Sequence, residues 1–514
     1  MSYNHGTYGQ LMPTGTYSEE SPSLVAYIGT APIHKIAGQS KTENLVNYPL
    51  KITSLNVARN LLGYTEKADF SDYTLCEAVE AHFKNNLENV GPIYCINILD
   101  PAENATPMEE ALSFPVQKKQ VAFTLGDLVL DSMTVEVLGE EVAVEGEEGT
   151  EVEASPELVE GVDYKMVYDS SSDTVTITFT GSNIPTMIAI KGDIVDPTVE
   201  ASQVIGAIDL DGKKSGLKVL QDIFPKSNEV VNVLAAPGFS EIPEVYEAMI
   251  SAVQKINGHW DAYVNADIPM RDGDTSIKSI SKAIEWKEDH SYDSGLSKVY
   301  WPQSLRKDGK VFHLSTLASA KMQALDSASN GVPYISVSNQ VIDAADQYHP
   351  DGLNPFDVEE ANKLNEKGIT TLIRWGGAYR LWGPHTAAYS YNEGETEQIN
   401  PVYDFDTSIR TMLHITNSFQ KDNFDDIDSP MTPNLKDVIL HREQSKLDTL
   451  KCMGALLGEP KIYFSDDNSA TSIMGGNFIW DIQATTTMPF KSGTVRLGYT
   501  NDGVYTLLNS DEEE

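Results

Sequence analysis

The chain has 514 residues, too many for one ordinary hydrophobic core, so two to four domains are expected. It carries 76 acidic and 37 basic side chains, and a surface with a net charge of -39 repels nucleic acid and anionic membranes. No apolar run approaches the roughly 18 residues that span a bilayer, and the N-terminus lacks the basic and apolar segments of a signal peptide. We therefore expect a protein made in a cytoplasm, with neither a membrane nor nucleic acid as a direct partner.

The first hundred residues predict an arm followed by an α/β layer. Residues 1–22 are rich in Gly, Tyr, Ser and Thr, which is typical of an extended arm or of a disordered terminus. Residues 23–31 and 92–99 are short apolar runs typical of buried strands, and residues 54–62 and 75–87 have the spacing of amphipathic helices. Strand, helix and strand in this order predict an α/β layer.

Residues 101–199 have a different character and predict an all-β insertion domain. Residues 121–164 contain no Lys or Arg, and their acidic loop over 139–161 predicts a solvated surface loop. A calcium site is the alternative for this loop, although the Asp-rich spacing of an EF-hand is absent. Short β-branched runs separated by turns predict strands at 121–125, 133–137, 164–168 and 174–180.

The α/β pattern resumes from residue 200. Gly216 opens a predicted helix, and the apolar runs at 229–238 and 260–269 predict two buried strands. A predicted helix over 241–256 joins these strands, and such a βαβ unit indicates a partly parallel sheet.

Helices dominate the predicted C-terminal part. Apolar residues recur at helical spacing over 404–420, and a second helix is expected over 433–458 with Gly458 as its C-terminal cap. The expected apolar face of this second helix consists of Val438, Ile439, Leu447, Leu450 and Leu457. Residues 493–499 and 504–508 flank the turn Asn-Asp-Gly, which predicts a terminal β-hairpin.

Catalytic signatures are missing from the sequence. The motifs of phosphate loops, dinucleotide-binding turns, zinc hydrolases and serine nucleophile elbows do not occur. Cys76 and Cys95 lie in apolar contexts and are expected to be buried reduced thiols, so we expect no structural metal and no cofactor. Asp267 ends a predicted strand, where α/β enzymes place catalytic acids, so an acidic hydrolase built around Asp267 stays open as an alternative.

One run carries a family resemblance. Residues 374–387 read Arg-Trp-Gly-Gly-Ala-Tyr-Arg-Leu-Trp-Gly-Pro-His-Thr-Ala, and they follow Leu-Asn-Glu-Lys-Gly-Ile. This resembles the pattern Leu-Asn-x-x-Gly-Ile followed by Trp-Gly-x-Arg-Thr of contractile tail sheath proteins, although His385 stands where that family usually has Arg. The signature residues are Gly368, Arg374, Trp375, Gly377, Arg380, Trp382, Gly383 and Thr386.

Further blocks resemble the same family in the same order along the chain. They are residues 25–32, 47–53, 216–217, 236–238, 267–269, 300–302, 454–458 and 476–480. Residues 314–319 depart from the family, because they replace its usual Pro-Pro-Ser-Gly stretch. The order of the blocks, rather than any single one, carries the resemblance.

The resemblance implies a mixed α/β fold with a discontinuous core. An α/β core would be formed by residues 23–100 and 200–384, with the all-β insertion domain at 101–199 between them. Residues 385–492 would form a C-terminal sheath domain. The division is completed by two extended arms, an N-terminal one at 1–22 and a C-terminal one at 493–514.

The resemblance also implies a structural function without catalysis. Such subunits polymerise helically, as stacked hexameric rings, around a tail tube in a virion tail, and they contact baseplate and tail terminator proteins. Contraction of the sheath would drive the tube through the target cell envelope. The alternative is another self-assembling virion or surface protein, such as a capsid or S-layer subunit. The arms would add strands to sheets of neighbouring subunits through Tyr8, Leu11, Val495, Leu497, Val504 and Tyr505.

Overall fold

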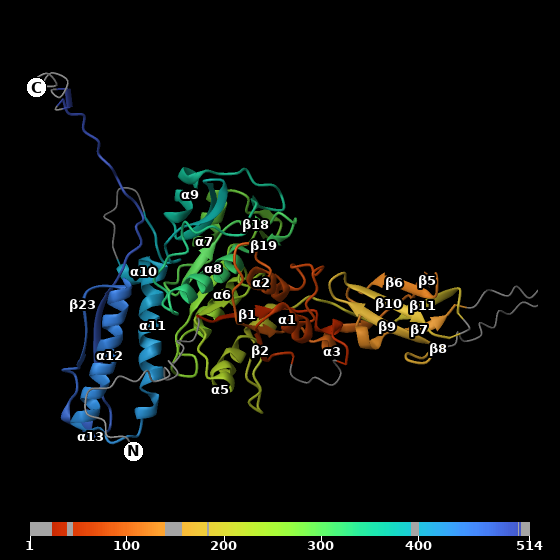
Figure 1. The fold of residues 1–514 in the computed structure, drawn as a ribbon, viewed down its shortest axis with the longest axis horizontal. Coiled ribbons are helices and arrows are strands. Elements are labelled where there is room, and N and C mark those ends of the chain that lie inside the picture. The colour runs from red at the N-terminus through yellow and green to blue at the C-terminus, as the bar shows by residue number, and fades with distance from the viewer. Residues whose placement is uncertain are drawn as a thin grey trace, which may run out of the picture.

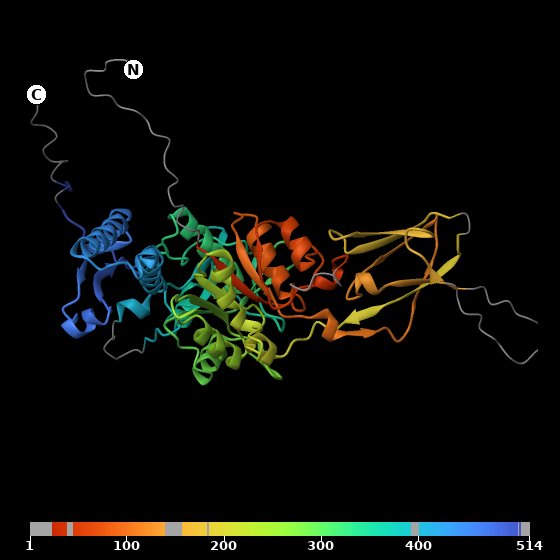
Figure 2. The same ribbon diagram turned by 90° about the horizontal axis from the view of Figure 1, so that it is seen from below.

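The computed structural model describes residues 23–38, 45–138, 157–181, 184–391, 400–501 and 503–504. Its described part has three masses in a row: a β-rich insertion at one end, an α/β core in the middle, and a unit of long helices at the other end (Figures 1 and 2). Helices and strands are mixed throughout the described chain, which confirms the predicted α/β class. The predicted domain boundaries stay predictions.

An eight-stranded sheet forms the centre of the core. Its strand order is β2-β3-β1-β13-β14-β17-β21-β22, and the six inner strands are parallel to one another. The outer strands β2 and β22 pair antiparallel. In sheet order the bounds are Pro49–Ile52, Ile93–Asn97, Val25–Gly29, Val233–Ala235, Tyr263–Asp267, Ser297–Tyr300, Ile369–Trp375 and Ala378–Trp382. The sheet confirms the expected βαβ arrangement, because β13 and β14 are parallel neighbours joined by a helix.

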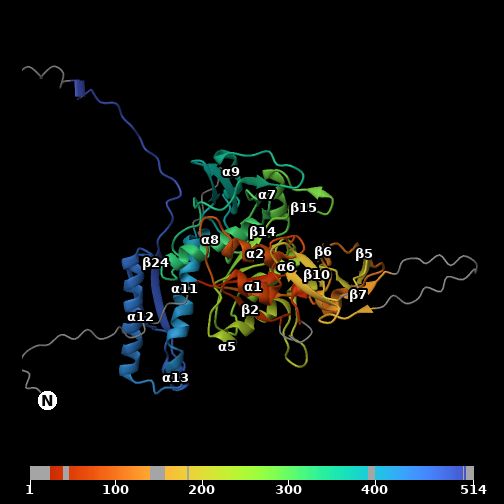
Figure 3. The ribbon, with the colours of Figure 1, turned by 45° about the vertical axis from the view of Figure 1, so that its right-hand side comes forward.

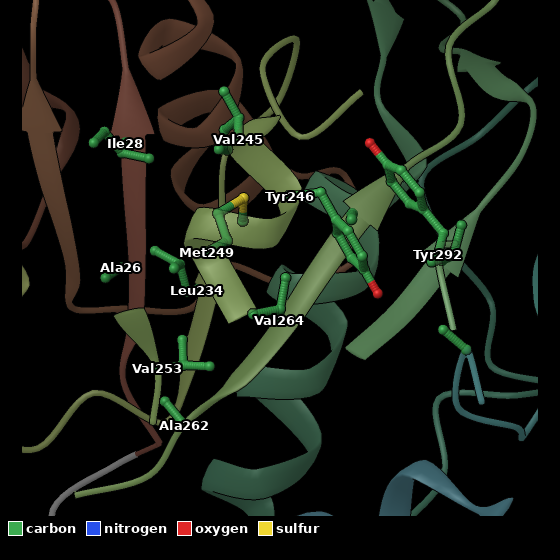
Figure 4. Packing of buried hydrophobic residues seen from close by; sticks show 14 of the residues in the cluster. Ala26, Ile28, Leu234, Val245, Tyr246, Met249, Val253, Ala262, Val264 and Tyr292 are labelled. Atoms are coloured by element: carbon green, nitrogen blue, oxygen red, sulfur yellow. The ribbon is translucent and has the colours of Figure 1, made fainter. Parts of the chain in front are cut away.

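Two apolar layers cover the two faces of this sheet. Alternate residues of β1 point to opposite layers, since Ala26 and Ile28 belong to one cluster and Val25 and Tyr27 to the other. Figure 4 shows part of the first cluster, in which side chains of helix α6 (Pro243–Ala252) cover Ala26 and Ile28. The first layer also receives α7 (Ile280–Asp289) and α9 (Val358–Asn365), and the second receives α1 (Leu55–Leu62), α2 (Thr74–Phe83) and α8 (Leu314–Ala328).

Shorter elements complete the core. The helix expected from Gly216 begins as the 3-10 helix η4 (Gly216–Asp222) and continues as α5 (Ile223–Ser227). Helix α2 ends at Phe83, four residues before its expected end, because the chain turns there through side-chain hydrogen bonds of Asn85. The remaining elements are η1 (Ile33–Lys35), α4 (Ala201–Ile205), β15 (Arg271–Asp272), β16 (Thr275–Ser276), β18 (Gln303–Leu305), β19 (Val311–Phe312) and β20 (Asp346–Tyr348).

The insertion consists of small antiparallel sheets around its own apolar cluster. One sheet has the order β6-β10-β9, with bounds Gln120–Thr124, Thr174–Phe179 and Tyr164–Asp169. The other has the order β5-β11-β7-β8, with bounds Leu112–Pro115, Met187–Lys191, Thr134–Val137 and Glu157–Leu158. All four expected strands are confirmed. Next to the core lie α3 (Pro101–Asn104), η3 (Leu130–Ser132), β4 (Ala105–Pro107) and β12 (Asp193–Val195).

Two long helices and a hairpin form the C-terminal unit, whose small core contains Ile415, Leu447, Leu450 and Ile462. Its elements are α10 (Pro401–Asp404), α11 (Asp406–Asp422), η5 (Phe424–Asp426), α12 (Pro433–Met453), β23 (Leu456–Phe464), α13 (Ala470–Met474) and β24 (Trp480–Thr486). None of the helices among the described residues is both long and apolar enough to cross a membrane.

The expected end of the second long helix is wrong. Helix α12 stops at Met453, because Gly454 adopts the left-handed conformation with φ 87 that ends a helix. Gly458 lies inside β23 instead, where Leu457 is exposed. Val438 is exposed as well, so only Ile439, Leu447 and Leu450 of the expected face are buried.

The expected terminal hairpin is also wrong in its first strand. Residues 493–499 pair with no strand of the described chain, and most of residues 504–508 lie outside it. Residues 487–501 instead leave the C-terminal unit as an extended tail that points away from the rest of the molecule (Figures 1 and 3).

Candidate assembly surface

The first half of the signature run forms the tip of a hairpin. Strands β21 and β22 are joined by Gly376 and Gly377, whose φ angles of 63 and 85 are those that a tight two-residue hairpin turn requires. Arg374 and Trp375 flank this turn at the solvent-exposed end, and Trp375 is 63% exposed. An exposed Trp at a hairpin tip is a candidate contact residue.

The outer edge of this hairpin is already covered. Asn339 N–H donates to Leu381 O at 2.6 Å, and Leu381 N–H donates to Gln340 O at 3.0 Å. The Arg380 guanidinium donates to Asn339 O at 2.7 Å, which fixes the segment around Asn339 and Gln340 against strand β22. Strand β22 therefore offers no free backbone edge along this stretch to another chain.

Two signature glycines allow close packing beside the hairpin. Gly368 has a φ of 66, and a Cβ there would lie 2.6 Å from Thr386 O. Gly383 has a φ of 138, and a Cβ there would collide with the side-chain amide of Asn365. Any side chain would be strained and would collide, so both glycines are required by the fold.

The second half of the run joins the core to the C-terminal unit. Lys298 on β17 is fully buried, and its ammonium donates to Gly383 O at 2.8 Å and to His385 O at 3.0 Å. The same ammonium pairs with the buried carboxylate of Asp406, the first residue of α11, at 2.9 Å. Burial lowers the pKa of Lys298, and the Asp406 carboxylate opposes that shift. A buried charge with this many partners fixes helix α11 against the large sheet.

Neighbouring contacts strengthen the same junction. Arg410 on α11 pairs with buried Asp326 on α8, and the Thr386 hydroxyl donates to Tyr403 O. His385 stacks on Tyr389 with ring centroids 3.5 Å apart, and burial lowers its pKa to about 3, so the ring is neutral. His385 is therefore a structural residue.

The signature residues thus divide into two groups. Gly368, Gly383 and Thr386 meet at the junction, whereas Arg374, Trp375 and Gly377 lie at the exposed tip. Trp382 lies between the groups, and its indole N–H donates to Asn362 Oδ1 at 2.9 Å. Their predicted role in subunit contacts stays a prediction.

A free sheet edge occurs in the C-terminal unit. Strands β23 and β24 form a two-stranded sheet, in which Ser465 N–H donates to Ile479 O. This register points the backbone groups of Trp480, Ile482 and Ala484 away from β23. No hydrogen bond from the described chain reaches these outward groups. The sequence pattern of β24 alternates, but its edge position was not predicted.

The opposite edge of the same sheet is better covered. The Gln444 side chain on α12 accepts from Ile462 N–H at 3.2 Å and donates to Pro460 O at 3.0 Å. Strand β23 is therefore partly satisfied by its own helix. Strand β24 is the open edge, and such an edge is a template for another strand.

The tail that follows β24 exposes apolar side chains. Lys491 donates to the Tyr389 hydroxyl at 3.2 Å and is the last anchor before the tail leaves the unit. Beyond it Val495, Leu497 and Tyr499 are 90%, 95% and 86% exposed. These apolar side chains are spaced by two, and no part of the described chain covers them. This pattern is typical of a strand that pairs with the sheet of a partner.

The predicted arm residues are only partly described. Val495 and Leu497 are exposed on the tail, and Val504, beyond its last residue, is exposed as well. Tyr8, Leu11 and Tyr505 lie outside the described residues. Their roles as subunit contacts stay predictions.

Asp267 belongs to a buried polar cluster that sequence reasoning missed. Its carboxylate accepts from the backbone N–H and the hydroxyl of Ser315 at the start of α8. Nearby, His313 Nδ1 lies 2.7 Å from Glu77 Oε2, and its Nε2 lies 3.5 Å from Glu241 Oε1. Burial lowers the pKa of His313, but these two carboxylates outweigh burial and raise it well above 6.5. Asp267 is 3% exposed and acts in packing between the sheet and α8.

Known proteins of similar sequence carry one description. No protein-family profile matches the chain. The tail sheath protein of Burkholderia phage BcepMu is 23% identical over 530 residues, covering 98% of this chain and 98% of that protein. The tail sheath protein of Escherichia phage P2 is 24% identical over 326 residues, covering 60% of this chain and 73% of that protein. The major tail sheath protein of Serratia phage KSP20 is 23% identical over 301 residues, covering 57% of this chain and 69% of that protein.

Solved structures share the fold. A chain of the anti-feeding prophage baseplate superposes with a TM-score of 0.54 at 13% identity, covering 97% of this chain and all of that one. A chain of the PVC contractile injection system sheath, in its contracted state, also gives 0.54 at 11% identity, covering 98% of this chain. At such identities these likenesses show the fold alone.

Proposed function

We propose a mode of assembly for this chain, which belongs to the contractile tail sheath family and is a structural subunit of a contractile sheath. Its subunits polymerise helically around a tail tube, and contraction of the polymer drives that tube through a target envelope. The baseplate triggers contraction at one end, and a terminator protein closes the other end. The relatives named tail sheath proteins do not favour a capsid, a surface layer or a hydrolase as the alternative.

The observation that carries the proposal is an open strand edge next to an uncovered tail in one molecule. The tail cannot fold back onto β24 of its own subunit without reversing directly after that strand, and residues 487–501 do not reverse. A neighbouring subunit supplies the missing partner. Each subunit then gives its tail to one neighbour and receives a tail from another, which is a heterologous contact that builds a helix instead of a closed pair.

The buried junction supports a mechanical role. Lys298, Asp406, Arg410 and Asp326 fix the C-terminal unit to the α/β core, so a pull on the tail is carried into the large sheet. Subunits of this kind rotate as rigid bodies while the backbone links between them persist. New contacts between subunits, formed on contraction, supply the energy.

The test is assembly of chains that lack one arm. A chain ending at Thr487 keeps β24 and all of α12, so it is expected to fold and to remain monomeric. The full chain is expected to form hollow, helically striated cylinders in negative-stain electron microscopy at high concentration or on addition of its tube protein. A chain lacking residues 1–22 is expected to fold and to fail in the same way. Normal cylinders from the chain ending at Thr487 would refute the tail exchange.

Tube dependence separates this function from other assemblies. A sheath subunit co-sediments with its tube as coated cylinders, whereas a capsid or surface-layer subunit forms shells or sheets that ignore the tube. Failure of the full chain to coat its tube would refute the sheath proposal.

A further inference from the structure

Two unpaired charges lie on the open strand and on the tail. Asp481 is the second residue of β24, and no ion pair joins its carboxylate to any residue of the described chain. Arg496 lies in the middle of the exposed tail and likewise has no ion-pair partner among the described residues. The tail residues 487–501 contain Lys491 and Arg496 but no acidic side chain, although the whole chain has a net charge of -39.

Both segments have two distinct faces. Along β24, Trp480, Ile482 and Ala484 pack on the core of the C-terminal unit, and the alternation of strand side chains places Asp481 on the opposite face. Along the tail, Val495 and Leu497 share one face when the segment is extended, and Arg496 lies on the other.

Strand pairing then brings matching faces together. If the tail lies along the open edge with its apolar face toward the core, Val495 and Leu497 continue the row of Trp480 and Ile482. Arg496 is then on the same side of the sheet as Asp481. When Arg496 is directly opposite Asp481, Val495 and Leu497 are opposite Trp480 and Ile482 in either strand direction.

We propose that the tail of a second copy of this chain binds along β24 with Arg496 opposite Asp481, and that this ion pair sets the register of the joined strands. The inference rests on the proposed tail exchange. The apolar pattern by itself excludes a slip of one residue, because that slip would turn Arg496 toward the core. It does not exclude a slip of two residues, which keeps the faces and places Arg496 beside Gln483. Only the opposite charge at Asp481 distinguishes these two registers.

Charge reversal tests the pair. Asp481→Lys and Arg496→Glu each place like charges across the joint, so each is expected to raise the protein concentration needed for assembly about fivefold, in line with a cross-strand pair. The double variant restores opposite charges and is expected to assemble at the original concentration. Lys165→Glu makes the same change of charge on an exposed position of β9 in the insertion, away from both proposed contact segments, and serves as the matched control. If the double variant needs as high a protein concentration for assembly as either single variant, the inference is overturned.

Cross-linking tests the register directly. A background of Cys452→Ser removes the exposed native thiol, while Cys76 and Cys95 are buried. Asp481→Cys and Arg496→Cys, combined in this background, place two thiols directly opposite each other in the proposed register. Mild oxidation is therefore expected to give a ladder of covalent oligomers. Gln483→Cys combined with Arg496→Cys is the matched pair for the slipped register. A ladder from the second pair and not from the first would overturn the inference.

The two proposals fail in different ways. If the chain ending at Thr487 assembles normally, both the tail exchange and its register are refuted. If that chain stays monomeric while the charge variants assemble like the original protein, the tail exchange stands and the Arg496 register is refuted.

Discussion

The buried ammonium of Lys298 is expected to hold much of the stability of the junction between the core and the C-terminal unit. Its substitution Lys298→Met keeps the length of the side chain and removes the charge. The Asp406 carboxylate, with 1% of its side chain exposed, then loses its ionic partner, and the carbonyls of Gly383 and His385 lose a donor. Breaking a buried pair on one side costs about 3–5 kcal/mol, because the remaining charge stays buried and uncompensated.

That loss is large against the total stability of a folded domain, which is about 5–15 kcal/mol. The chain ending at Thr487 is the suitable background, since assembly would otherwise add its own stability. Urea unfolding followed by tryptophan fluorescence gives the free energy, and hydrogen exchange at the start of α11 locates the change. In Lys298→Met, amide hydrogen exchange is expected to become faster in α11 and to stay unchanged in the insertion.

The double variant Lys298→Met, Asp406→Leu removes both charges and fills the space with apolar atoms. It is expected to recover most of the lost stability, because a well-packed apolar pair avoids the cost of burying charge. A loss below about 1 kcal/mol in Lys298→Met would show that the site behaves like a surface pair. A double variant as unstable as Lys298→Met would likewise refute the assignment, since the cost would then not come from the orphaned carboxylate.

Three further predictions concern other buried groups. Asp173→Ala removes the partner of the buried Lys35, whose ammonium lies 2.9 Å from Asp173 Oδ1, so a loss of about 3–5 kcal/mol and faster hydrogen exchange in β9 and β10 are expected; unchanged exchange there would contradict the role of this pair in anchoring the insertion. Gly383→Ala is expected to lower the thermal midpoint by several degrees, because its Cβ would collide with the side-chain amide of Asn365, whereas Gly377→Ala at the open hairpin turn meets no neighbour and adds only backbone strain. Burial raises the pKa of Asp267 from 3.8 to about 7, so the folded state holds a proton that the unfolded chain has released; the free energy of unfolding is therefore expected to fall as the pH rises from 4 to 7, and Asp267→Asn is expected to flatten that slope in urea titrations.

Local sequence patterns predict the core strands well, and the reason is burial on both faces. Strands β1 and β3 are nearly continuous apolar runs, and β14 departs from this only at Asn265 and Asp267, which are hydrogen bonded. Helices cover both sides of the sheet, so every buried side chain must be apolar or satisfied. The insertion strands are equally clear. Along β10, buried Val175, Ile177 and Phe179 alternate with half-buried threonines, which is the pattern of a strand with one buried face. In each of these segments the local preference agrees with the final fold.

The C-terminal hairpin was harder to predict, because its signals conflict. Strand β23 contains Gly458 and Pro460, which favour a break, and the apolar spacing of α12 continues as far as Leu457 in the sequence. The left-handed Gly454 decides the boundary, and several glycines nearby offered the same signal. Pro460 is tolerated because β23 is an edge strand whose helix-facing groups are met by Gln444.

The buried ionic groups could not be predicted from local patterns at all. Lys298 lies in a strand and Asp406 begins a helix more than one hundred residues later, and neither carries a motif. The cluster of Glu77, Glu241, Asp267 and His313 likewise joins four separate segments. Such contacts arise from the topology of the sheet, which places the ends of distant segments together.

The same topology explains how one subunit can be rigid inside and linked outside. Up to Lys491 the chain is fixed, since Thr487 N–H donates to Ala455 O and Lys491 donates to Tyr389. From residue 492 to residue 500 no hydrogen bond joins the tail to the rest of the described chain. In the proposed tail exchange, residues 492–494 link the Lys491 anchor to the strand that joins the neighbour. A change in the angle between two subunits can be absorbed by this short link, while the proposed joined strands and the Lys298 junction keep their geometry. Rotation between subunits then requires no unfolding of either one, which is the condition for a sheath that shortens without breaking.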